Sequence, residues 1–118
     1  MISITQEAKN VVVANVLGEF KLADFLELEQ AVGETLQQGG RANLLVNLQD
    51  MLNFSIDVAW EEIKFTRRHS RDFDRIALVA GSQWQEWAAW LERLFIEGDF
   101  QVFEDFQEAH AWVQSGDA

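Results

Sequence analysis

The sequence contains no cysteine, no proline and no tyrosine, and only two of its 118 residues are histidine. Without cysteine the protein cannot form disulfides or use thiolate chemistry, and this composition favours a reducing cytoplasm. The first residues, MISITQEAKN, lack the basic and apolar regions of a secretory signal peptide. Uncharged apolar runs are far shorter than the ~20 residues that a membrane-spanning helix needs. These absences predict a cytoplasmic domain.

Basic residues are also scarce. Nine Lys and Arg residues stand against 20 Asp and Glu residues, which gives a net charge of −11 at pH 7 and a pI near 4.4. Nucleic acid is bound largely through phosphate neutralisation, so such a field repels it. Residues 64–75 are the exception, because five basic residues there face two acidic ones. We expect no nucleic-acid partner, and one local anionic contact at this basic segment.

Recognisable catalytic motifs are missing. Neither His69 nor His110 has metal-ligand spacing around it. Gly81 and Ser82 form too short a segment for a dinucleotide-binding loop, and no nucleophile elbow is present. We predict that the protein is not an enzyme and that it binds no cofactor and no metal.

Apolar runs and helical periods predict nine elements in the order β-β-α-β-α-β-α-β-α. Strands are expected at Ile2–Thr5, Val11–Leu17, Asn43–Leu48, Arg75–Ala80 and Phe100–Phe103. Helices are expected at Leu22–Gln38, Ile56–Arg71, Gln83–Ile96 and Asp105–Gln114. The order predicts an α/β fold with a mostly parallel sheet of about five strands, an antiparallel first strand and about four helices. No linker or repeat divides the chain, so residues 1–118 are expected to form one domain.

Several local features refine this scheme. Ser55 is predicted to be the N-cap of the second helix, and Ser82 with Gln85 has the spacing of a capping box for the third. Gln49–Phe54 is expected to be a loop. It is predicted to act with Gly81 and Ser82 as a hinge between the helices.

The second and third predicted helices carry more aromatic and basic surface than covering helices need. On a wheel of ~100° per residue, a basic stripe adjoins the sheet-facing arc of the second helix, and a second apolar stripe adjoins that of the third. The residues predicted to contact an apolar ligand are Trp60, Phe65, Trp87, Trp90 and Leu94. The residues predicted to contact an anion or a membrane are Lys64, Arg67, Arg68, Arg71 and His69.

A simpler structural role is open for several of these aromatic residues. The indoles of Trp84 and Trp87 could instead cover the sheet and pack on the second helix. Elsewhere, His110 is expected at the plain surface, whereas the core is expected to include Phe100, Phe103, Ala109 and Trp112.

The spacing of aromatic residues along the chain resembles the SpoIIAA-like family. The matching positions are Trp60, Phe65, His69, Phe73, Arg75, Ile76, Ala77, Trp84, Phe103, Ala109 and Trp112. The resemblance implies the STAS-type fold, which anti-sigma-factor antagonists and transporter cytoplasmic domains share. It also implies a likeness to the CRAL-TRIO lipid-carrier fold, and hence apolar-ligand binding and membrane association.

One departure from the resembled family concerns its phosphoswitch. Antagonists that are switched by phosphorylation carry an Asp-Ser-Ser-Gly-type motif at the start of the helix after the third strand. The matching residues here are Asn53–Val58, in which Ser55 is the only hydroxyl residue. We therefore do not expect phosphorylation at Ser55.

Two functional hypotheses remain. The first is a non-enzymatic module that holds an apolar or amphipathic small molecule between the second and third helices and associates peripherally with the inner face of the membrane. The alternative is a protein-interaction or regulatory module of the anti-sigma-factor-antagonist type, which docks a partner or forms a homodimer without a phosphoserine switch.

Overall fold

A five-stranded mixed sheet forms the centre of the molecule. The computed structural model describes residues 1–8, 10–55, 64, 72–86, 89 and 99–115. The sheet has the order β1-β2-β3-β4-β5. Its strands are β1 (Ile2–Glu7), β2 (Val11–Phe20), β3 (Ala42–Phe54), β4 (Phe73–Val79) and β5 (Asp99–Phe103). Only β1 is antiparallel to its neighbour, and the other pairs are parallel. The predicted α/β architecture is therefore confirmed.

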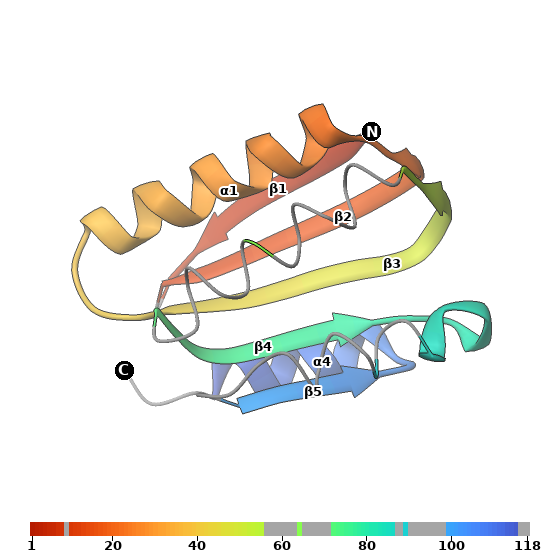
Figure 1. The fold of residues 1–118 in the computed structure, drawn as a ribbon. Helices are drawn as coiled ribbons and strands as arrows, with labels where there is room; N and C mark the ends of the chain where they lie inside the picture. The colour runs from red at the N-terminus through yellow and green to blue at the C-terminus, as the bar shows by residue number, and fades with distance from the viewer. Residues whose placement is uncertain (9, 56–63, 65–71, 87–88, 90–98, 116–118) are drawn as a thin grey trace.

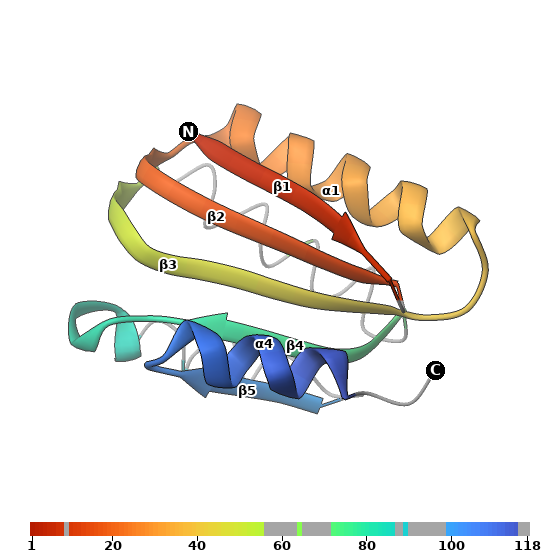
Figure 2. The same ribbon diagram turned by 180° about the vertical axis from the view of Figure 1, so that it is seen from behind.

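Two α-helices occur in the described part of the chain, α1 (Leu22–Gln37) and α4 (Phe106–Gln114). They lie on opposite faces of the sheet: α1 is in front in Figure 1, and α4 is in front in the reverse view of Figure 2. About four helices were predicted, and the structure confirms two of them. The predicted helix over 56–71 and most of the predicted helix over 83–96 lie outside the described residues.

The larger hydrophobic core, called the main core below, lies between the sheet and α1. Alternate strand residues point to this side, and the largest of its fully buried side chains include Phe20, Phe73 and Leu48. The ring centroids of Phe20 and Phe25 are 6.0 Å apart. Helix α1 ends before Gly39 and Gly40, whose φ angles of 103° and 81° lie in the left-handed region that glycine adopts without strain.

A smaller core lies under α4. Val11, Leu45 and Val79 contribute from the sheet, and Ala109 and Val113 contribute from the helix. The side chain of Asp105 accepts a hydrogen bond from the backbone N–H of Glu108 and caps the helix. The predicted core role is confirmed for Ala109, which is fully buried, while Trp112 and Phe103 pack against this smaller core and Phe100 packs against the main core.

His110 is not a plain surface residue, so that prediction was wrong. Its Nε2 lies 2.9 Å from the Oε1 atom of Glu7, and its ring stacks on Phe106. Gln114 donates a second hydrogen bond, 3.0 Å long, to the same Glu7 oxygen. The side chains of His110 and Glu7 are only 27% and 29% exposed. These contacts tie the end of β1 to α4 across more than 100 residues of sequence, which local pattern cannot reveal.

The prediction of a loop at Gln49–Phe54 was also wrong, because these residues continue β3. They pair with Leu17–Phe20, so β2 is longer than predicted as well. Two register shifts accommodate the pairing, and Gly18 at the second shift has a φ of 69°. Hydrogen bonding across the two strands outweighs the polar, loop-like composition of this segment. A strand in a paired sheet does not act as the predicted hinge loop.

Ser82 does not cap a helix as predicted. It is the first residue of a 3₁₀ turn, η1 (Ser82–Trp84), whose N-cap is Gly81. The side chain of Gln85 donates a 2.8 Å hydrogen bond to the carbonyl of Ala80 instead of completing a capping box. This bond fixes the chain where it leaves β4.

Candidate functional site

Strand β3 extends beyond its neighbour β4 at the carboxyl end of the sheet. It pairs with β4 as far as Asn47, but with β2 as far as Phe54. We call the unmatched segment, residues 48–54 of β3 with residues 17–20 of β2, the overhang. The Trp84 indole donates a 3.2 Å hydrogen bond to the Met51 carbonyl on the edge that β4 does not reach. Ligands of α/β proteins commonly bind at the carboxyl ends of the strands, which makes the overhang the candidate site.

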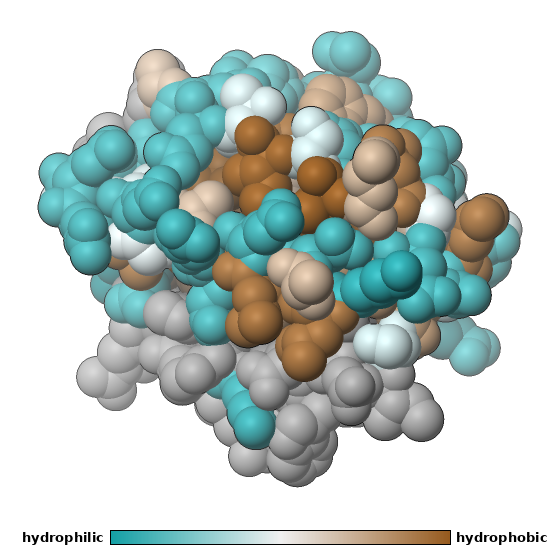
Figure 3. Space-filling view, turned by 90° about the horizontal axis from the view of Figure 1, so that it is seen from above, coloured by the Kyte–Doolittle hydropathy of each residue, from teal (hydrophilic) through white to brown (hydrophobic). Residues whose placement is uncertain are grey.

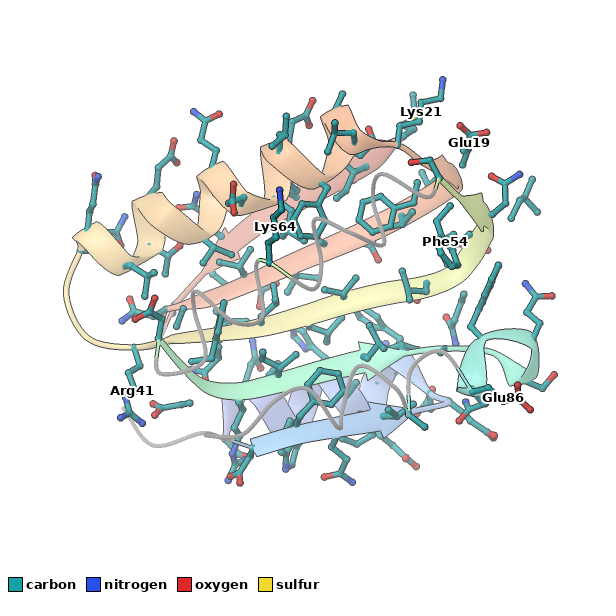
Figure 4. All side chains as sticks on the ribbon, in the orientation of Figure 1. Glu19, Lys21, Arg41, Phe54, Lys64 and Glu86 are labelled. Carbon is teal, nitrogen blue, oxygen red and sulfur yellow. The ribbon has the colours of Figure 1, made fainter. Side chains whose placement is uncertain are left out.

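The face of the overhang that looks toward α1 is aromatic. The rings of Phe54 and Trp84 have centroids 5.5 Å apart, and both residues pack against the main core. Figure 4 shows Phe54 at the same end of the molecule as Glu19, Lys21 and Glu86. This face is therefore largely filled by the protein's own side chains.

Ser55 directly follows the overhang. It is half-buried, and its N–H donates a 3.3 Å hydrogen bond to the carbonyl of Phe20. The serine is thus attached to the sheet. Its predicted N-cap role concerns the helix predicted over 56–71, which lies outside the described residues apart from residue 64.

The opposite face of the overhang is exposed and partly hydrophobic. Leu52 is 76% exposed and Leu17 is 39% exposed. Because Met51 and Val16 belong to the main core, strand alternation directs Leu52 and Leu17 to the reverse side of the sheet, where α4 lies. Met1, 74% exposed, adjoins them, because its carbonyl accepts a 2.8 Å hydrogen bond from the N–H of Leu17.

Carboxylates accompany these hydrophobic residues. Glu19 and Asp50 are exposed, and they neighbour the buried Phe20 and Met51 along the strands, so the same alternation places them on the reverse face. We call Met1, Leu17, Glu19, Asp50 and Leu52 the carboxyl patch. It combines large apolar side chains with negative charge and so suits recognition better than catalysis.

The described residues contain no group of three or more His, Asp or Glu side chains that could hold a metal ion. Within the same ranges, no helix is long and apolar enough to cross a membrane. Neither observation bears on the residues outside these ranges.

Most of the predicted contact residues lie outside the described residues: Trp60, Phe65, Trp87, Trp90 and Leu94 of the apolar set, and Arg67, Arg68, Arg71 and His69 of the anion-contacting set. Lys64 is described, and it is exposed on the side of the sheet that faces the viewer in Figure 4. Both predicted sets therefore stay predictions. Trp84 is only half-buried, but it packs against the main core and closes the end of the sheet.

Sequence reasoning missed Leu17 and Leu52. Buried Leu48 and Met51 are three positions apart, with exposed residues between and after them, so this end of β3 shows no two-residue alternation that would mark a strand. The two register shifts in the pairing of β3 with β2 interrupt the alternation.

The fold defines a class of protein: a small α/β domain with a five-stranded mixed sheet. The family model described as SpoIIAA-like matches residues 11–114. The chain belongs to the SpoIIAA-like family. A comparison with curated proteins gives no match.

Solved structures agree at the level of the fold. An uncharacterised protein with a SpoIIAA-like fold from Shewanella loihica has a TM-score of 0.73 and 22% identity, over 96% of this chain and 92% of that one. The anti-sigma factor antagonist SpoIIAA in its unphosphorylated form has a TM-score of 0.71 and 12% identity, over 98% and 99%. An anti-sigma factor antagonist from Mycobacterium paratuberculosis has a TM-score of 0.58 and 15% identity, over 98% and 96%. At these identities the likeness shows the fold alone.

Proposed function

We propose that this chain is a non-enzymatic protein-interaction module of the anti-sigma-factor-antagonist type, which acts by docking a partner. The carboxyl patch is the observation that carries the proposal, because exposed leucines at the end of a rigid sheet favour association over catalysis. The similarity of the fold to two anti-sigma factor antagonists supports it.

The module acts without a phosphoserine switch. Among residues 53–55, which the structure describes, Ser55 is the one hydroxyl, and its backbone is hydrogen-bonded to β2. The Asp-Ser-Ser-Gly-type motif of the switched antagonists has a second serine and a glycine, and the sequence has neither beside Ser55.

Affinity purification of the tagged chain from its host at low salt tests the proposal. We expect a second protein in stoichiometric amount, retained equally by wild type, Ser55→Ala and Ser55→Asp. Elution of the chain alone at every salt concentration would contradict the interaction role. Loss of the partner with Ser55→Asp but not with Ser55→Ala would contradict only the absence of a phosphoswitch.

The apolar-ligand hypothesis rests on Trp60, Phe65, Trp87, Trp90 and Leu94, and peripheral membrane association rests on Lys64 and the neighbouring basic residues. Of these residues the structure describes Lys64 alone, so both hypotheses stay predictions. Solvent extraction of the purified protein tests the first, because a bound lipid or fatty acid would be released. Vesicle flotation with anionic lipid at low salt tests the second, and the homodimer version is tested by light scattering.

A further inference from the structure

We infer that the carboxyl patch binds a basic segment of a different protein, whose apolar side chain packs against Leu17 and Leu52 while its Lys or Arg side chains pair with Glu19 and Asp50. This inference rests on the proposed function and names the surface and the chemistry of the partner.

The hydrophobic residues of the patch are concentrated, not scattered. Four large hydrophobic residues are exposed among those that the structure describes: Met1, Leu17, Leu26 and Leu52. Three of the four lie at one end of the sheet and on one face. Leu17 pairs with Asp50. Leu52 lies at the register shift of β3 opposite Gly18 and Glu19 of β2. Single exposed leucines are ordinary, whereas adjacent ones on a strand surface mark a contact.

Helix α4 leaves this area uncovered. It packs on β3, β4 and β5, and Figure 2 shows it over β4 and β5, with the carboxyl ends of β2 and β3 lying beyond it. The segment just before α4 contacts the overhang at Gln49. The side chain of Gln49 donates a 2.9 Å hydrogen bond to the carbonyl of Glu104. The sheet therefore continues past the helix with its reverse face bare of described elements.

The charge of the patch selects the partner. Within the described residues neither Glu19 nor Asp50 forms an ion pair, so both carboxylates can accept cations from outside. A second copy of the chain would bring the same carboxylates and a net charge of −11 to the interface, which opposes self-association. A segment in which Lys or Arg alternates with residues such as Leu can pair with the carboxylates of the patch and pack against its leucines.

Site-specific photo-crosslinking tests the inference directly. p-Benzoylphenylalanine is placed at Leu52 in the full chain expressed in its host, and at Leu26 in a control chain. Leu26 is 49% exposed but lies on α1, on the opposite side of the sheet. Figure 3, seen from above, shows that hydrophobic residues also reach the surface on the α1 side. Leu26 therefore tests whether any exposed hydrophobic residue would form an adduct.

We expect an adduct at Leu52 and none at Leu26, with the crosslinked segment, identified by mass spectrometry, rich in Lys or Arg around an apolar residue. A synthetic peptide of that segment should bind the wild type and weaken roughly tenfold with Leu52→Ser. The pair Glu19→Gln and Asp50→Asn should weaken it by roughly fivefold to tenfold and reduce its salt dependence. The matched controls Leu26→Ser and Glu27→Gln, both at exposed sites on α1, should leave binding unchanged.

The contrary outcomes are distinct. An adduct at Leu26 but not at Leu52, or a partner in the purified complex that gives no adduct at Leu52, overturns the patch while the interaction module stands. An adduct between two copies of this chain, or an adduct to an acidic segment, overturns the named occupant. No adduct at either position, together with a chain that purifies alone, overturns the proposed function itself.

Discussion

At the scale of single residues, Gly18 shows how one backbone conformation shapes the overhang. It lies at a register shift between β2 and β3 and has a φ of 69°, yet a Cβ atom built there would meet no heavy atom within 4 Å. The requirement for glycine is therefore conformational, because the left-handed region strains other L-residues whatever the available space.

Gly18→Ala should lower the free energy of unfolding by ~1 kcal/mol, as measured by urea denaturation. Gly33→Ala is the matched control: Gly33 lies inside α1 with an open Cβ site and ordinary φ. That change should raise stability by up to ~1 kcal/mol through helix propensity. If both substitutions changed stability in the same direction, the conformational explanation would fail.

Trp84 contacts the carboxyl end of β3 through its ring packing on Phe54 and its hydrogen bond to the Met51 carbonyl. Trp84→Phe keeps most of the ring packing against Phe54 but removes the hydrogen bond to the Met51 carbonyl, so it should cost ~1 kcal/mol of stability. Gln83→Ala provides the comparison, since its Nε2 lies 3.5 Å from the same oxygen and the bond is weaker. A larger loss of stability for Gln83→Ala than for Trp84→Phe, measured by thermal unfolding, would show that Gln83 and not Trp84 makes the stronger hydrogen bond to the Met51 carbonyl.

At the scale of elements, α4 is held by its hydrophobic core and by the contacts of Glu7 with His110 and Gln114. Glu7→Ala should destabilise the protein by ~1 kcal/mol because it removes the acceptor of both side chains. Gln6→Ala is a control on the same strand, where an exposed 3.1 Å hydrogen bond to Glu34 is lost at little cost. Equal effects of the two changes in chemical denaturation would show that Glu7 does not hold the helix.

Some helices and strands can be predicted from the sequence more reliably than others. All five strands were predicted in order, because apolar runs such as Val11–Val13 and Ile76–Val79 are buried on both sides of the sheet and read as strands from composition alone. The predicted helix bounds at Gln38 and Asp105 lie within one residue of the observed ends of α1 and α4, since helix termination and capping are local chemistry. The overhang was missed because residues 49–54 become a strand only through pairing with β2, which lies more than 30 positions earlier.

The candidate site was harder to predict for the same reason. Leu52 is exposed because β4 ends opposite Asn47 and α4 lies over β4 and β5, short of the overhang. Neither boundary can be read from the residues around Leu52. His110 likewise gave no local sign of its contact with Glu7. The contact roles predicted for the aromatic and basic residues between 60 and 94 stay predictions, because Lys64 alone of them lies within the described residues.

At the scale of the whole molecule, net charge governs both stability and association. A charge of −11 on a chain of 118 residues opposes compaction through self-repulsion, and added salt screens that repulsion. We therefore expect the thermal unfolding temperature at pH 7 to rise with NaCl, from low ionic strength to well above the physiological level. A fall in unfolding temperature over that range would mean that attractive ion pairs outweigh the repulsion.

Native mass spectrometry of the gently purified protein, at increasing ammonium acetate, tests the central claim most directly. The account predicts a complex of this chain with one different protein that carries a basic segment; the complex dissociates as ionic strength rises and is strongly reduced for Leu52→Ser. A chain that carries no second protein but holds an apolar molecule released by solvent would contradict it, and would establish a ligand carrier instead.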